Sequence, residues 1–287
     1  MKKEELSALI RQKASFLCVG LDTDPGLIPP FLAGESEDPV FEFNRRIIDA
    51  TIDLAVAYKP NMAFYEQMGS KGWKSLERTM DYLREHPAGP VFTIADAKRA
   101  DIGNTSQRYA RAFFDQLGFD AITVNPYLGH DSVKPFLEHE DKWAIVLALT
   151  SNAGAMDFQI LQPQLPLLLE KFGIKTCFRK KLFELVIEES QKWGSPENMM
   201  FVTGATHPEQ LKNVRELAPD HFLLLPGIGA QGAKLSDIAR VTLNKDAGII
   251  VNSSRAIIYA GEGQDFQSKA REAAMALQRE MAQLLGQ

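Results

Sequence analysis

The chain repeats one pattern eight times: a short apolar run is followed by a stretch with helical periodicity. Each run is almost continuously apolar and does not alternate, which is typical of a parallel strand that is buried on both faces. The eight runs are residues 16–22, 54–61, 91–98, 121–127, 143–152, 199–206, 222–229 and 247–255.

Helical patterns fill the intervals between these runs. Residues 104–118 place apolar side chains at helical spacing and end in glycine, residues 178–194 have the same spacing, and residues 267–285 form a long amphipathic segment. This alternation predicts an α/β protein with a single (β/α)8 TIM barrel over residues 1–287. A doubly wound sheet is the alternative, because alternation alone does not prove that the sheet closes.

Polar residues gather at the carboxyl ends of the apolar runs. In a barrel these ends lie on one face, which is where active sites occur. The longest irregular stretch, about residues 153–176, follows the fifth run and predicts an insertion or flap over the same face.

Composition excludes several classes of function. The net charge of −5 provides no basic excess for nucleic acid or an anionic membrane surface. Two distant cysteines, Cys18 and Cys177, and five histidines without metal-ligand spacing predict no disulfide framework and no metal site. No apolar run approaches the roughly 18 residues of a membrane span, and no signal peptide is recognisable. We therefore expect a cytoplasmic protein.

The most informative segment surrounds the end of the third run. Asp96 and Lys98 are two residues apart on a strand and so point the same way, and Asp101 follows in the turn before the next helix. Lys59 ends the preceding run. Two lysines and two aspartates can thus form an alternating charged cluster in which the carboxylates keep the amines protonated. The alternative is a pair of structural ion pairs at a strand end.

A second segment, residues 226–232, is rich in glycine and follows the seventh run. Its G-x-G-x-x-G letters match a dinucleotide loop only weakly, because that motif belongs to the first unit of its fold. Loops after strands seven and eight of a barrel commonly bind phosphate, and Arg255 at the end of the eighth run could grip a phosphate with two hydrogen bonds. The glycines could instead serve only tight turns.

The run DAKRADIGNT resembles the D-x-K-x-x-D-I-G-x-T signature of orotidine 5′-phosphate decarboxylases, in the longer bacterial branch of that family. Six more segments fit in the same order: VGLD, YKPN, TVNPYLG, LTSN, PGIGAQG and NSSR. The resemblance covers about residues 16–258, nearly the whole chain.

This resemblance implies a set of catalytic residues. Lys98 would donate the proton to C6 of the pyrimidine. Asp96 and Asp101 would flank the substrate carboxylate, and Asp101 would come from the second subunit of a homodimer with shared active sites. Lys59 would pair with Asp96 and touch the ribose.

The resemblance also implies the residues that bind the nucleotide. Ser151 would read the pyrimidine edge, Asp22 would touch the ribose, Gln231 and Arg255 would hold the phosphate, and Thr105 would come from the partner subunit. Asn61, Pro226 and Ser254 complete the substrate-binding set.

The implied reaction converts orotidine 5′-phosphate to UMP, the last step of de novo pyrimidine synthesis, with no cofactor and no metal. The protein itself must stabilise the C6 carbanion electrostatically before Lys98 protonates it. One rival is a related phosphate-binding barrel lyase that uses Mg²⁺ on a keto-sugar phosphate. Another is a Schiff-base aldolase, whose lysine would have to be neutral. A non-catalytic nucleotide-binding barrel is a third.

Overall fold

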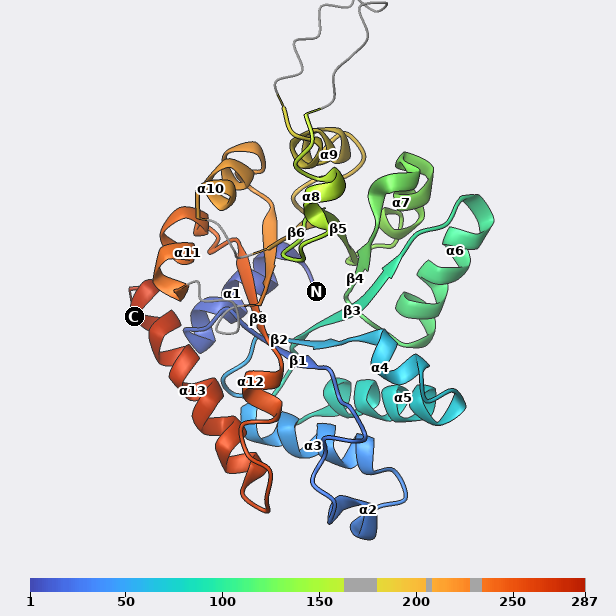
Figure 1. Ribbon diagram of the computed structural model, residues 1–287, viewed down its shortest axis with the longest axis vertical. Helices are drawn as coiled ribbons and strands as arrows, with labels where there is room; N and C mark the ends of the chain where they lie inside the picture. Colours follow the sequence, from blue (N-terminus) through green and yellow to red (C-terminus); the bar gives the residue numbers. More distant parts are fainter. Residues whose placement is uncertain (163–179, 205–207, 228–233, 287) are drawn as a thin grey trace, which may run out of the picture.

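Eight parallel strands form the centre of the molecule and pair in sequence order until β8 returns to β1. The computed structural model describes residues 1–162, 180–204, 208–227 and 234–286 (Figure 1). Because β1 pairs with both β2 and β8, the sheet has no open edge. The predicted (β/α)8 barrel is confirmed, and the doubly wound sheet is excluded. The strands are β1 Leu17–Leu21, β2 Ala57–Pro60, β3 Phe92–Arg99, β4 Ala121–Val124, β5 Trp143–Leu149, β6 Met199–Thr203, β7 Phe222–Pro226 and β8 Ile249–Ser253.

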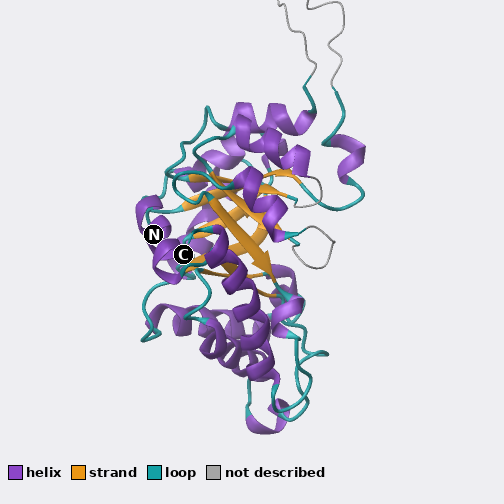
Figure 2. Ribbon diagram, turned by 90° about the vertical axis from the view of Figure 1, so that its left-hand side faces the viewer, coloured by secondary structure: helices purple, strands orange, loops and turns teal. Residues whose placement is uncertain are grey.

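Helices surround the barrel as an outer layer (Figures 1 and 2). In chain order they are α1 Lys3–Lys13, α2 Leu32–Glu35, α3 Pro39–Thr51, α4 Met62–Glu66, α5 Ser70–Glu85, α6 Gly103–Arg111, η1 Ala112–Gln116, η2 Pro126–Leu128, α7 His130–Leu137, α8 Ala155–Phe158, α9 Leu182–Ser190, α10 Pro208–Leu217, α11 Leu235–Thr242, α12 Arg255–Ile258 and α13 Phe266–Leu284. None of the helices in the described ranges is long and apolar enough to cross a membrane.

The predicted element boundaries differ from the observed ones mainly at the ends. Seven strands lie inside their apolar runs, and only β3 extends one residue further, to Arg99. The helix predicted over 104–118 begins as α6 and ends as a π-helical turn, η1, before Gly118, whose φ of +74° stops it. Of the insertion predicted at about 153–176, α8 is described, and residues 163–176 lie outside the described part of the chain.

Large aromatic side chains fill the amino end of the barrel. Phe92, Trp143 and Phe222 begin the alternate strands β3, β5 and β7 and are fully buried. The Trp143 ring meets the other two edge to face, with centroid distances of 6.2 Å to Phe92 and 6.3 Å to Phe222. Alternate strands contribute such layers in barrels of this kind. The amino end is therefore packed with apolar groups, and the carboxyl end is left for polar chemistry.

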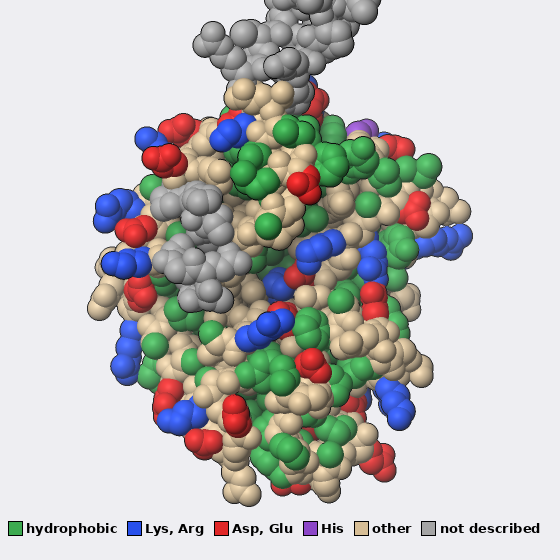
Figure 3. All heavy atoms as spheres, in the orientation of Figure 1, with side chains coloured by type: hydrophobic (Ala, Val, Ile, Leu, Met, Phe, Trp, Pro, Cys, Tyr) green, Lys and Arg blue, Asp and Glu red, His purple; other side chains and the backbone are tan. Residues whose placement is uncertain are grey.

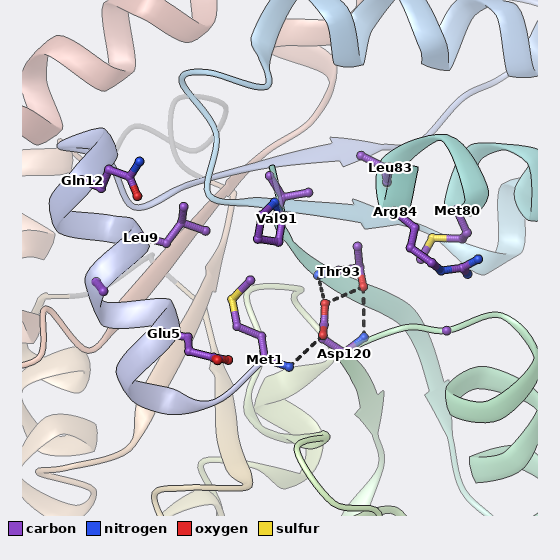
Figure 4. A pocket seen from close by; sticks show the side chains of 13 residues that line it. Met1, Glu5, Leu9, Gln12, Met80, Leu83, Arg84, Val91, Thr93 and Asp120 are labelled. Carbon is purple, nitrogen blue, oxygen red and sulfur yellow. Dashed lines mark hydrogen bonds and ion pairs between the residues drawn. The ribbon is translucent and has the colours of Figure 1, made fainter. Parts of the chain in front are cut away.

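A cavity of about 540 Å³ lies outside this layer of aromatic side chains, between α1, α5 and the start of β3 (Figure 4). Its polar contacts are structural. Asp120 accepts hydrogen bonds from the backbone nitrogen and the hydroxyl of Thr93, both at 2.9 Å, and pairs with the amino group of Met1 at 3.0 Å. These bonds join three elements at the end of the barrel opposite to the polar strand ends.

His221 immediately precedes β7 and is a buried titratable group at the same end of the barrel. Its side chain is 4% exposed, and neither ring nitrogen has a hydrogen-bond partner among the described residues. Burial, reinforced by the positive charges of Lys3 and Arg215 and opposed by Asp220, lowers the pKa of His221 to about 4. The folded protein therefore holds this imidazole neutral at neutral pH.

We expect His221 to make the fold sensitive to acid. An unfolded histidine binds a proton near pH 6.5, so stability is full above that pH and falls as the pH drops toward 4. Between pH 7 and pH 5 the contribution lost is about 2 kcal/mol. Urea unfolding at both pH values should show a smaller loss for His221→Leu than for the wild type, whereas His130→Leu, at an exposed position, should keep the wild-type loss. Equal losses in all three proteins would contradict this role.

Candidate active site

Polar side chains converge on the face formed by the carboxyl ends of the strands. Figure 3 shows basic and acidic side chains beside one another in a hollow at the centre of the molecule. A cavity of about 250 Å³ opens there. It is lined by Lys59, Asp96, Lys98, Thr123, Leu147, Thr150, Ser151, Asn152, Val202, Leu224 and Pro226. Five of the predicted site residues are thus brought to one cavity: Lys59, Asp96, Lys98, Ser151 and Pro226.

The carboxylate of Asp96 is shared between two lysines. Its Oδ2 lies 2.7 Å from Lys59 Nζ, and its Oδ1 lies 2.5 Å from Lys98 Nζ. Lys59 Nζ is also 4.0 Å from Oδ1 of Asp22, which directly follows β1. An alternating row of charges is present, but its members are Asp22, Lys59, Asp96 and Lys98: Asp22 takes part, and Asp101, the second aspartate of the predicted cluster, has no ion pair with it among the described residues. The Lys59 side chain is 5% exposed, whereas that of Lys98 is 53% exposed, so the outer lysine is the more accessible of the two to a ligand.

The electrostatics of this row follow from burial and charge together. Burial opposes ionisation of Asp96, but the charges of Lys59 and Lys98 and their hydrogen bonds outweigh it and lower the Asp96 pKa to about 2. Burial likewise opposes the charged form of Lys59, but the Asp96 and Asp22 carboxylates raise its pKa above the ordinary value. Asp96 is therefore an anion and Lys59 a cation at neutral pH.

A bulge in β3 places Asp96 and Lys98. Between the pairs Ala95–Ile122 and Arg99–Val124, three β3 residues stand opposite one β4 residue, Thr123. Lys98 takes a φ of +48°, which is unusual for a residue other than glycine and costs about 1–2 kcal/mol. The sequence predicted that side chains alternate regularly along this strand, which would point Asp96 and Lys98 the same way. The bulge interrupts that alternation, yet both side chains still reach the same site.

The end of β5 is held by side-chain hydrogen bonds around Ser151. Gln159, just after α8, accepts a bond from the Thr150 backbone nitrogen at 2.7 Å and donates to the Thr150 hydroxyl at 2.9 Å. Gly204, which follows β6, packs so closely against Ser151 that a Cβ on Gly204 would lie 2.8 Å from the Ser151 nitrogen. These contacts fix the backbone that carries Ser151.

The end of β8 presents a free cation. Arg255 is exposed in the first turn of α12, and its guanidinium has no hydrogen bond or ion pair with the described residues. Ser254 instead points inward: its hydroxyl accepts a bond from Asn252 Nδ2 at 3.1 Å and would lie 1.9 Å from a Cβ on Gly20. The glycine of VGLD is therefore needed to make room for Ser254.

The remaining predicted residues lie at the rim or beyond it. Asn61 caps α4, with its Oδ1 accepting from the Ala63 nitrogen at 3.3 Å. Asp101 precedes α6, and the exposed Thr105 lies in the first turn of that helix. Asp101 has no ion pair within 4.0 Å in the described ranges of its own chain. Gln231 lies outside the described residues.

Thr123 and Asn252 are among the polar residues of this face that the sequence analysis did not identify. Thr123 lines the cavity, and Asn252 holds the Ser254 hydroxyl while its own Oδ1 has no hydrogen-bond partner among the described residues. Each is a polar residue inside an otherwise apolar run, and that was the signal that could have identified them. No group of three or more His, Cys, Asp or Glu side chains in the described segments is placed to hold a metal ion.

Comparisons with known proteins find relatives over nearly the whole chain. Residues 15–270 match the profile of the orotidine 5′-phosphate decarboxylase / HUMPS family. The chain is 52% identical over 285 residues to the orotidine 5′-phosphate decarboxylase of Flavobacterium johnsoniae, covering 99% of this chain and 98% of that one.

Solved structures are similar over the same span. The OMP decarboxylase of Leishmania donovani superposes with a TM-score of 0.76 at 33% identity, covering 97% of this chain and 99% of that one. The UMP synthase of the same organism gives a TM-score of 0.76 at 35% identity, covering 94% of this chain but 56% of that longer one.

Proposed function

This chain belongs to the orotidine 5′-phosphate decarboxylase / HUMPS family, and we propose that it converts orotidine 5′-phosphate to UMP and CO₂. The observation that carries the proposal is the row of alternating charges at the barrel mouth, in which Asp96 lies between Lys59 and Lys98. The full-length likeness to named decarboxylases favours this reaction over that of a keto-sugar-phosphate lyase.

The exposed end of the row suits the chemistry. Loss of CO₂ leaves an electron pair on C6, and the Lys98 ammonium would stabilise it and then protonate that carbon. Asp96, held ionised by its two lysines, would lie against the substrate carboxylate and disfavour the ground state. Lys59, buried behind Asp96, would keep the row in place and meet the ribose with Asp22.

The rest of the nucleotide would extend across the barrel mouth. Ser151 would read the pyrimidine edge from the end of β5. Arg255, exposed and unpaired within the described chain, would hold the phosphate opposite. Ser254, Pro226, Asn61 and Gln231 would complete the binding surface. Phosphate binding far from C6 would supply the energy that orients the reacting group.

We further propose a homodimer in which Asp101 and Thr105 complete the partner's site. Asp101 has no cation partner within the described ranges of its own chain, although Lys98 is only three residues away. Large apolar side chains are exposed beside it and at the neighbouring end of β4: Ile102, Leu128 and Tyr127, the last 88% exposed. Such exposure is typical of a surface that another protein covers.

The buried free thiol of Cys18 suits a cytoplasmic enzyme.

The reaction is tested by following the loss of orotidylate absorbance in the presence of EDTA. Wild-type protein should turn over without metal, whereas a Mg²⁺-dependent lyase would be inactive. Lys98→Ala should lose at least about a thousandfold in kcat, since proton transfer and charge stabilisation both fail, yet still bind UMP. Lys134→Ala, an exposed lysine of α7, is the control. A Lys98→Ala variant that kept a tenth of the wild-type kcat would refute the assignment.

Arg255→Ala should weaken ligands that carry the phosphate and spare those that lack it. A charged hydrogen-bonding pair is worth about 1.5–3 kcal/mol, so we expect about a 10- to 100-fold loss of UMP affinity. Uridine affinity should be nearly unchanged, as calorimetry would show. An equal loss for both ligands would count against this role.

The shared site is tested with two inactive variants. In a heterodimer of Lys98→Ala and Asp101→Asn chains, one site would receive both changes and the other neither. Random mixing makes half of the dimers mixed, so about a quarter of the wild-type activity should return. Purified heterodimers without activity would show that Asp101 acts within its own chain.

A further inference from the structure

Thr123 occupies a special position opposite the β3 bulge. Its side chain is buried, and its hydroxyl oxygen accepts hydrogen bonds from the backbone nitrogens of Ala97 at 3.0 Å and Lys98 at 2.9 Å. The bulge removes these two N–H groups from the regular pairing of β3 with β4. A side chain of β4 therefore replaces the hydrogen bonds that the β4 backbone would otherwise provide.

The same hydroxyl also reaches the charged row. It can donate its single proton to Asp96 Oδ1, which lies 3.2 Å away, or to the Ala95 carbonyl at 3.5 Å. Asp96 Oδ1 is the oxygen that binds Lys98 Nζ at 2.5 Å. One hydroxyl thus contacts both the backbone that carries Lys98 and the carboxylate that orients its ammonium.

We propose that Thr123 is a positioning residue for the decarboxylation, and this inference rests on the proposed function. It acts through Lys98 and Asp96: it holds Lys98 in its left-handed conformation and fixes the direction of the Asp96 carboxylate. Without the hydroxyl, two partly buried N–H groups lose their partner and the bulge relaxes. The Lys98 ammonium then leaves the place where the C6 charge develops, because pre-organised groups work only when they stay in position.

The experiment compares Thr123→Val, which keeps the shape but removes the hydroxyl, with Thr123→Ser, which retains it. We expect Thr123→Val to lose about 10- to 100-fold in kcat, as a displacement of about 1 Å can cause. Thr123→Ser should remain near the wild type. Should Thr123→Val fail to fold, Thr123→Ala compared with Thr123→Ser gives the same contrast with less crowding.

A binding ratio separates positioning from general damage. Wild-type protein should prefer a UMP analogue with an anionic oxygen on C6 over UMP itself, because Lys98 faces that oxygen. Thr123→Val should reduce this preference about 10- to 100-fold while UMP affinity changes little. A purely structural role would weaken both ligands together.

Thr93→Val provides a matched control on the same strand. The Thr93 hydroxyl also accepts a backbone N–H, that of Asp120 at 3.0 Å, and donates to a carboxylate oxygen of Asp120 at 2.9 Å, but at the opposite end of β3. Thr93→Val should lower the melting temperature without changing kcat or the ligand preference.

Three results would overturn the inference. One is a Thr123→Val protein with wild-type kcat and ligand preference, another is an equal change in Thr93→Val, and the third is a Thr123→Ser protein as impaired as Thr123→Val. An inactive wild type would refute the proposed function itself, and this inference with it, so the two failures are distinguishable.

Discussion

The shared carboxylate of Asp96 is the interaction on which the site depends. Each of its oxygens meets one lysine, at 2.7 Å for Lys59 and 2.5 Å for Lys98, and these two cations lower its pKa to about 2 despite burial. A buried anion with only one partner would be costly, as would the buried Lys59 ammonium without Asp96 and Asp22. The charges of the row therefore stabilise one another, and its exposed end is the Lys98 ammonium.

The barrel makes this arrangement possible by separating its two ends. Phe92, Trp143 and Phe222 close the amino end with apolar surface, and their packing supplies stability that the charged mouth does not. Strand β3 contributes to both ends of the barrel. At its amino end Thr93 is hydrogen-bonded to Asp120, and at its carboxyl end Asp96 and Lys98 form part of the charged row. The regular part of β3 pairs with the neighbouring strands, and its bulge, with Lys98 in a left-handed conformation, places Asp96 and Lys98 in the charged row.

Much of the fold could be predicted because strands that are buried on both faces appear in the sequence as nearly continuous apolar runs. The eight apolar runs predicted the eight strands, and the residues at their ends predicted the site, including the contacts of Lys59 and Lys98 with Asp96. Other features depend on atoms that sequence spacing does not place. The inward turn of Ser254 over Gly20, for example, brings together residues that are distant in the chain.

By itself, the sequence determined the alternation of elements, the polarity of the strand ends and the charged residues that meet there, since each of these follows from local periodicity and side-chain chemistry. Only the tertiary structure decided that the sheet closes, because closure is the pairing of β1 with β8, more than two hundred residues apart. It also decided the β3 bulge and the hydrogen bonds that Thr123 makes there. A bulge is a relation between two strands, and no single strand's residues specify which hydroxyl will stand opposite.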